Sequence, residues 1–154
     1  MKHGIGKITY KDKSEYHGYW ENGKKHREGV FKYINKDIYS GSWKHGKKDG
    51  KGTYIFNDTT MKFVGDWKAG KFVHGKWIFP NGTYYEGAFE NNMPKGIGKW
   101  YFKNGNTADG VYDQKVNTED QNAGEESKGP NINLTWNTKT DISAKAMLVN
   151  GIER

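Results

Sequence analysis

The sequence predicts an all-β fold: a single-layer antiparallel meander of consecutive β-hairpins, followed by a short C-terminal tail. Three observations support this prediction. Glycines recur at a constant spacing, aromatic and polar residues alternate with a period of two around them, and turn-forming residues separate the alternating blocks. The chain has 154 residues, which is enough for one domain and few for two.

Each copy of the repeat opens with a block in which a glycine is followed by two large residues. The glycines Gly6, Gly29, Gly52, Gly75 and Gly98 define a 23-residue period. The residues two and four places after them are, in order, Ile8 and Tyr10, Phe31 and Tyr33, Tyr54 and Phe56, Trp77 and Phe79, and Trp100 and Phe102. This alternation is typical of a half-buried strand rather than a helix.

A second block in each copy has the pattern aromatic-x-Gly-x-aromatic. Its ring pairs are Tyr16 and Trp20, Tyr39 and Trp43, Phe63 and Trp67, and Tyr85 and Phe89, with a degenerate fifth copy over 108–112. A side chain in place of the central glycine would collide with a ring of the adjacent strand, so the pattern predicts packing of rings on backbone. We assign these eight rings to the packing of the sheet, together with Tyr54, Phe56, Trp77, Phe79, Trp100 and Phe102.

Turn residues join the blocks. Asn22-Gly23, His45-Gly46 and Ala69-Gly70 follow the second block, and Pro80-Asn81-Gly82 follows the first. Such residues tolerate the positive φ that hairpin turns need. About ten strands spaced about 4.8 Å apart predict a ribbon roughly 50 Å long, in which each hairpin contacts chiefly its neighbours.

The chain changes character after residue 113. Residues 1–113 hold 22 of the 23 aromatic residues, with 20 Lys and Arg against 12 Asp and Glu, whereas the remainder holds 5 against 6. We therefore assign 1–113 to the repeat sheet, 114–131 to a polar linker and 132–154 to a C-terminal segment. That segment contains a candidate strand at 134–136 and a candidate helix at 141–149, and the sequence leaves open whether it folds back on the sheet or docks on a partner.

The composition argues against several classes of function. The chain has no cysteine, so it has neither a disulfide scaffold nor a thiolate zinc site. We expect no catalytic residue, no metal and no cofactor, because no polar constellation interrupts the repeat. The N-terminal residues lack the apolar segment of a secretory signal, so we expect an intracellular protein. The five histidines occupy different phases of the repeat, and we expect none to have a paired carboxylate: His3, His17, His26, His45 and His74.

Basic residues gather near the turns that follow the second block, in a chain of net charge +7. We assign seven of them to a candidate contact edge: Lys24, Lys25, Arg27, Lys47, Lys48, Lys51 and Lys71. A basic edge attracts anionic phospholipids or acidic protein surfaces. We expect no nucleic acid, because the rings recur in the packing phase rather than on an exposed platform. The alternative, that these residues only keep the turns soluble, stays open.

The pattern Tyr-x-Gly-x-Trp-x-x-Gly-Lys followed by Gly-x-Gly-x-Tyr-x-Phe resembles the MORN repeat, the membrane occupation and recognition nexus motif, over residues 4–112. The closing copy, Asn-Met-Pro-Lys-Gly-Ile-Gly-Lys-Trp-Tyr-Phe at 92–102 followed by Gly110-Val111-Tyr112, is similar to the last repeat of the radial spoke head proteins of motile cilia.

This resemblance implies a non-enzymatic structural scaffold in the axoneme of a cilium or flagellum, located in the cytoplasm and cytoskeleton. Its expected partners are other radial spoke or axonemal proteins, and a homodimer is left open. The alternative is a peripheral membrane adaptor that binds anionic phospholipids through the lysine-rich edge.

Overall fold

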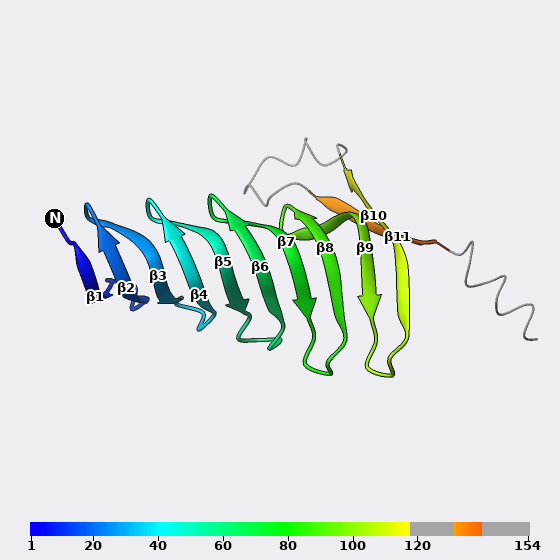
Figure 1. Cartoon of the computed structure of the whole chain (residues 1–154), viewed down its shortest axis with the longest axis horizontal. Helices are drawn as coiled ribbons and strands as arrows, with labels where there is room; N and C mark the ends of the chain where they lie inside the picture. The colour runs from blue at the N-terminus through cyan, green and yellow to red at the C-terminus, as the bar shows by residue number, and fades with distance from the viewer. Residues whose placement is uncertain (118–130, 140–154) are drawn as a thin grey trace, which may run out of the picture.

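The computed structural model describes residues 1–117 and 131–139, which form one open antiparallel sheet without a helix among them. Strands follow one another in chain order, each hydrogen-bonded to the next (Figure 1). They are β1 (Gly4–Thr9), β2 (Glu15–Glu21), β3 (Lys24–Lys32), β4 (Ile38–Lys44), β5 (Lys47–Ile55), β6 (Lys62–Lys68), β7 (Lys71–Ile78), β8 (Tyr84–Glu90), β9 (Met93–Tyr101), β10 (Thr107–Val116) and β11 (Ile132–Thr138). The predicted all-β meander of hairpins is confirmed. In the described part of the chain no helix is long and apolar enough to span a membrane.

The tight turns inside the hairpins have the backbone conformation that their sequences predict. Their central residues all have φ between 48° and 88°. Two consecutive positive φ values are characteristic of the type I′ turn, whose twist matches that of the flanking strands. The central pairs are Asn22-Gly23, His45-Gly46, Ala69-Gly70 and Asn91-Asn92.

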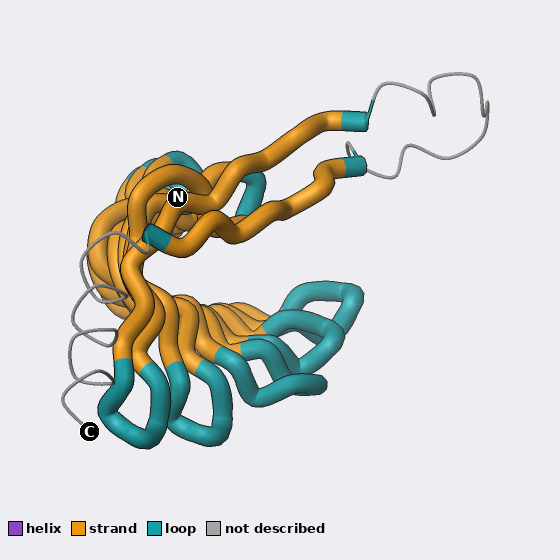
Figure 2. The backbone as a smooth tube through the Cα atoms, turned by 90° about the vertical axis from the view of Figure 1, so that its right-hand side faces the viewer, coloured by secondary structure: helices purple, strands orange, loops and turns teal. Residues whose placement is uncertain are grey.

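A continuous row of glycines crosses the sheet in the middle of its bent strands. Figure 2 looks along the row of strands and shows that each one bends, so that the sheet is curved in cross-section. A Cβ atom on Gly41 would lie 2.5 Å from the carbonyl oxygen of Lys51, so the bend leaves no room for a side chain there. The glycines that pair across successive strands are Gly6, Gly18, Gly29, Gly41, Gly52, Gly65, Gly75, Gly87, Gly98 and Gly110.

Tyrosine rings fill the inside of the bend. Tyr16, Tyr39 and Tyr85 are 0% exposed, although the sheet is one layer thick. The Tyr16 hydroxyl donates a hydrogen bond to the carbonyl of Tyr19, 2.9 Å away in its own strand, so the strand curls around the ring. A Cβ atom on Gly18 would lie 2.6 Å from this hydroxyl. The glycine of the motif is therefore needed because it lets a single layer bury a tyrosine.

The second ring of each motif joins one repeat to the preceding one. Trp43 donates from Nε1 to the carbonyl of Gly29, 3.0 Å away. Its ring stands edge-on to Tyr16 of the preceding repeat, at 5.5 Å, and to Tyr39 of its own, at 5.1 Å. Edge-to-face pairs at this separation are favourable beyond the area they bury. The equivalent indole hydrogen bonds join Trp20 to Gly6 and Trp67 to Gly52.

The end of the repeat sheet differs from the prediction. The sequence predicts a linker from residue 114, but β10 continues to Val116 because β11 pairs with it from Gly110↔Thr138 to Val116↔Ile132. The strand expected at 134–136 is part of β11, so this part of the C-terminal segment extends the sheet. The linker residues 118–130 and the helix predicted at 141–149 lie outside the described residues.

We predict that Gly41→Val destabilises the protein far more than Ser40→Val. Valine at position 41 meets backbone that cannot move aside, whereas Ser40 is exposed on the outer face of the same strand. The first change should cost about 3 kcal/mol or more and the second less than about 1 kcal/mol, measured as the free energy of unfolding in urea. Equal costs would show that the glycine row does not constrain the bend.

We predict that the sheet unfolds cooperatively at high pH. Desolvation raises the pKa of Tyr16, Tyr33 and Tyr85 to about 12, from 10.0. The unfolded chain releases these protons first, so the stability they contribute is complete below about pH 10 and is lost as the pH rises toward 12. Phenolate absorbance and the loss of near-ultraviolet circular dichroism should follow one transition in this window. Phenolate that forms near pH 10 while the sheet persists would contradict this expectation.

Candidate functional site

The inner face of the bent sheet is lined by aromatic rings, and we call it the aromatic trough. Within the described residues its buried rings are Tyr16, Trp20, Tyr39, Trp43, Phe63, Trp67, Phe72, Tyr85, Phe89 and Tyr112. The partly buried rings packed against them are Tyr10, Phe31, Tyr33, Tyr54, Phe56, Trp77, Trp100 and Trp136. Exposed hydrophobic residues such as Ile5 (81%) and Ile97 (72%) lie on strand positions that alternate with the rings, and therefore on the outer face.

The structure places twelve of the fourteen predicted packing aromatics in this core or against it. The other two, Phe79 and Phe102, lie beside Trp100, with ring centroids 5.8 Å and 6.3 Å from it, and Phe102 is 42% exposed.

Six rings of the trough were not assigned to the packing from the sequence. Three of them, Tyr10, Phe31 and Tyr33, occupy the same repeat positions as assigned rings, so the period alone was sufficient to find them. The other three are Phe72, Tyr112 and Trp136. Tyr112 closes the degenerate fifth copy, whereas Phe72 and Trp136 lie outside both aromatic blocks and carry no signal in the repeat pattern.

Three lysines point into the trough at 23-residue intervals, and we call them the lysine ladder. Their ammonium groups lie over tryptophan rings of the neighbouring copy: Lys2 over Trp20 at 4.8 Å, Lys25 over Trp43 at 5.2 Å and Lys48 over Trp67 at 4.7 Å. An ammonium at this distance is attracted to the electron-rich face of an aromatic ring. The N-terminal half of the trough is therefore aromatic and cationic at once.

The ladder ends at the third copy, where Phe72 takes the lysine position. The 23-residue interval would place Lys71 there, but Trp67 pairs with Phe72 as Trp43 pairs with Lys48. This shift of register has two causes. Trp67 stands one position later than the repeat predicts, and the bulge opposite it leaves only Val73 unpaired. Phe72 is 1% exposed and stacks on Phe63 at 4.8 Å. The C-terminal half of the trough is consequently apolar.

The ladder lysines are held at their backbone by the next copy. The amide of the turn glycine one repeat later donates to the carbonyl of each: Gly23 to Lys2, Gly46 to Lys25 and Gly70 to Lys48, at 2.8–2.9 Å. The turns thereby fix the position from which each side chain enters the trough. The ladder is part of the repeat geometry rather than a set of independent surface residues.

Two ladder lysines carry their charge at an energetic cost. Lys25 and Lys48 are half-buried among rings, and this desolvation lowers the pKa of both ammonium groups. Within residues 1–117 and 131–139, neither forms a salt bridge with a carboxylate. The trough therefore presents positive charge without a counterion from the described sheet.

The seven basic residues predicted to share one contact edge lie on three surfaces, because successive side chains of a strand point to opposite faces. Lys25 and Lys48 face the trough. Lys24, Lys47 and Lys71 are exposed beside the tight turns. Lys47 pairs directly with Lys44 across its hairpin, and Lys71 pairs with Lys68. We call Lys24, Lys44, Lys47, Lys68 and Lys71 the turn-end lysines.

The remaining two basic residues lie on the outer face. Arg27 has a positive φ of 54° at the irregular register of β3, and its guanidinium lies 4.6 Å from the centroid of the Tyr19 ring. Lys51 forms a salt bridge with Asp66, with Nζ and Oδ1 2.6 Å apart. Lys51 therefore has a carboxylate partner, whereas Arg27 keeps its positive charge beside the Tyr19 ring.

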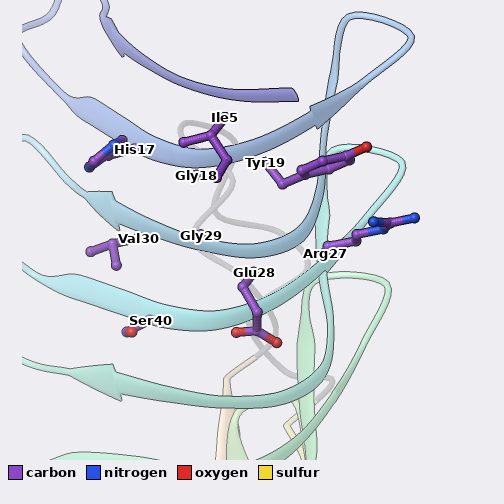
Figure 3. A pocket seen from close by; sticks show the side chains of 9 residues that line it. All are labelled: Ile5, His17, Gly18, Tyr19, Arg27, Glu28, Gly29, Val30 and Ser40. Carbon is purple, nitrogen blue, oxygen red and sulfur yellow. The ribbon is translucent and has the colours of Figure 1, made fainter. Parts of the chain in front are cut away.

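An open pocket lies on this outer face, over β1 to β4 (Figure 3). Figure 3 shows the Tyr19 ring and Arg27 on one side, His17 and Val30 on the other, and Glu28 between them. The Glu28 carboxylate accepts a hydrogen bond from the Ser42 hydroxyl at 2.7 Å. The groups that line the pocket do not converge on a point, so we assign no reaction to it.

The expectation that no histidine is paired with a carboxylate is wrong for one of them. The imidazole Nε2 of His26 lies 3.0 Å from a carboxylate oxygen of Glu21, and the rings of His26 and His45 lie 5.5 Å apart on adjacent turns. Among the described residues, no group of three or more His, Cys, Asp or Glu is arranged to hold a metal ion. We interpret the contacts of His26, with Glu21 in its own hairpin and with His45 in the next, as structural contacts near the turns.

A comparison with protein-family models agrees with this geometry. The MORN repeat matches five segments, 1–15, 16–38, 39–61, 63–84 and 85–107, together about two thirds of the chain. Three matches begin at Tyr16, Tyr39 and Tyr85, the fully buried tyrosines of the bend. The match over 63–84 is one residue shorter than the two before it, in agreement with the smaller bulge of β7, which contains only Val73.

Proposed function

Because the chain belongs to the MORN-repeat family, we propose that it is a non-enzymatic structural scaffold of the ciliary axoneme. In this proposal it is a radial spoke head component that takes part in ciliary motility through protein–protein contacts. The observation that carries the scaffold function is the aromatic trough. Its eleven strands form one layer, and within the described residues no second layer covers the inner face. A face that is lined by aromatic rings and not covered by a second layer is suited to binding another protein.

The placement in the radial spoke head rests on the closing copy, which resembles the last repeat of radial spoke head protein 1. In this copy Pro94 is buried opposite Phe89, at the position that holds a ladder lysine or Phe72 in earlier copies. The side-chain amide of Gln114 donates to the carbonyls of Glu90, Met93 and Pro94 at 2.9–3.1 Å. The copy thus ends the regular pattern, which supports its interpretation as a terminal repeat.

We predict that the protein remains with the axoneme when isolated cilia are treated with mild detergent. A scaffold held by protein contacts should not be extracted with the lipid. Rising salt should release it together with spoke proteins, because the charged contacts at the polar rim of a protein interface weaken as ionic strength rises. Mass spectrometry of the successive fractions measures this. Release of the protein by detergent alone would contradict its placement in the axoneme.

A second candidate function, peripheral membrane binding, is favoured by the turn-end lysines. Lys44 and Lys47 are directly opposite one another, as are Lys68 and Lys71. Like charges opposite each other destabilise a sheet, so their presence at an exposed edge requires a compensating role. Anionic phospholipid headgroups attract such a cluster by about 1 kcal/mol per lysine.

For this candidate we predict that changing Lys24, Lys47 and Lys71 to Glu abolishes binding to phosphatidylserine vesicles at low salt. The same change at Lys11, Lys62 and Lys103, which are exposed near the opposite ends of the strands, serves as the control because it alters the net charge equally. Vesicle co-sedimentation measures both variants. If both weaken binding to the same extent, net charge rather than the turn-end cluster is responsible.

A further inference from the structure

The lysine ladder is a repeated element of the trough that neither scaffold assembly nor membrane binding yet explains. We propose that it recognises acidic side chains of an apolar protein segment that lies along the trough. This deepens the proposed scaffold function, on which it rests, by naming the chemistry of the partner. The partner segment carries carboxylates toward β1 to β5 and apolar side chains toward β6 to β9.

Two successive hollows in the trough have the same chemistry. One, of about 270 Å³, is lined by the rings of Phe31, Tyr33 and Trp43, by Lys25, Lys47 and Lys48, and by the turn glycines Gly46 and Gly70. The next, of about 240 Å³, is lined by Lys48, Tyr54, Phe56, Phe63 and Trp67. Each combines aromatic walls with at least one lysine, which suits a carboxylate beside an apolar side chain.

Charge complementarity identifies the partner as acidic. Lys48 lies within 5.7 Å of four ring centroids, those of Tyr33, Tyr39, Tyr54 and Trp67. In that environment the ammonium loses water contacts, and no carboxylate of the described sheet replaces them. A carboxylate that entered the trough would supply the missing partner in a partly desolvated site, where such a pair is stronger than in water.

The position of the ladder favours a protein segment over a membrane surface. The ladder lysines lie inside the bend of the sheet, against rings, whereas the turn-end lysines are exposed beside the turns. A flat bilayer surface meets the exposed lysines first, whereas the half-buried ladder lysines are reached more easily by a single protein segment. Lys24 and Lys25 are therefore consecutive residues that serve different faces.

The repeat also sets the spacing of the acidic groups. Successive ladder lysines lie two strands apart, which corresponds to about 9.6 Å. Three residues of a polyproline II chain span about 9.3 Å and bring every third side chain to the same face, and seven residues of a helix span about 10.5 Å. The expected partner thus has Glu or Asp at every third position if it adopts the polyproline II conformation, or at every seventh position if it is helical, with apolar residues between them.

The test uses the full chain and two labelled peptides, one with Glu at every third position between Phe and Gly, and one helix-forming peptide with Glu at every seventh position among Leu and Ala. Fluorescence anisotropy measures the Kd at several salt concentrations. At least one peptide should bind, more weakly as salt rises, and its scrambled form and the form with Lys in place of Glu should not. Failure of both peptides to bind would overturn the proposal.

Matched variants separate the ladder from general charge. Lys25→Met with Lys48→Met keeps the length and apolar character of the side chains, and Phe72 at the equivalent position shows that an apolar residue fits there. This variant should raise the Kd by about tenfold or more, and Lys24→Met with Lys71→Met, at two exposed lysines that line neither hollow, should change it by less than about twofold. Lys25→Arg with Lys48→Arg should retain binding. Equal losses in the two methionine variants would overturn the proposal.

Two further outcomes would also overturn it. The first is that the ladder variants fold normally and lose binding to phosphatidylserine vesicles while neither peptide binds the parent chain, in which case the ladder recognises lipid. The second is that peptide binding requires Gln in place of Glu119, Asp120, Glu125 and Glu126, in which case the chain's own acidic segment is the occupant. Because the experiment uses the purified chain, its failure leaves the axonemal placement untouched, and the cilium fractionation tests that placement independently.

Discussion

The contact between a buried tyrosine ring and the glycine backbone of its own hairpin is the interaction on which the sheet depends. A single layer normally leaves both faces open to water, and an aromatic residue on such a layer stays partly exposed. Here each strand bends over the ring, and Tyr16, Tyr39 and Tyr85 reach 0% exposure. The bend brings backbone against backbone at paired glycines, so the Cβ atom of any other residue would prevent it. Glycine weakens an ordinary strand, and here the burial of the ring compensates for that cost.

The remaining architecture follows from repeating this contact. The indoles of Trp20, Trp43 and Trp67 donate to a glycine carbonyl of the preceding copy, and the turns at Gly23, Gly46 and Gly70 donate to a ladder carbonyl of the preceding copy, so the first neighbouring hairpins are joined at two places. Contacts beyond the nearest copies are not needed, which is the energetic behaviour of a repeat protein. Such a sheet tolerates variation of one copy as long as the ring, the glycine and the indole or its equivalent remain.

That tolerance gives the trough two chemically different halves. In the N-terminal copies the position opposite the second ring of the motif is lysine, and in the later copies it is Phe72, opposite Trp67, and then Pro94, opposite Phe89. The lysines add charge to an aromatic surface. The turn-end lysines place further positive charge beside the tight turns of the same hairpins. One repeat therefore supplies half-buried and exposed lysines.

The sequence alone was sufficient to predict the 23-residue period, the hairpins, the positive φ of their turns and most of the packing rings, because these depend on local alternation and on turn chemistry. It was insufficient to predict which lysines enter the trough. The 23-residue period places Lys71 on the ladder, and so does the alternation of side chains counted back from Gly75. The bulge at Val73 shifts the register, so that Phe72 occupies this position instead. It was likewise insufficient for the end of β10, which extends to Val116 only because β11 pairs with it. Register and strand pairing join residues that are distant in sequence, so only the tertiary structure decides them.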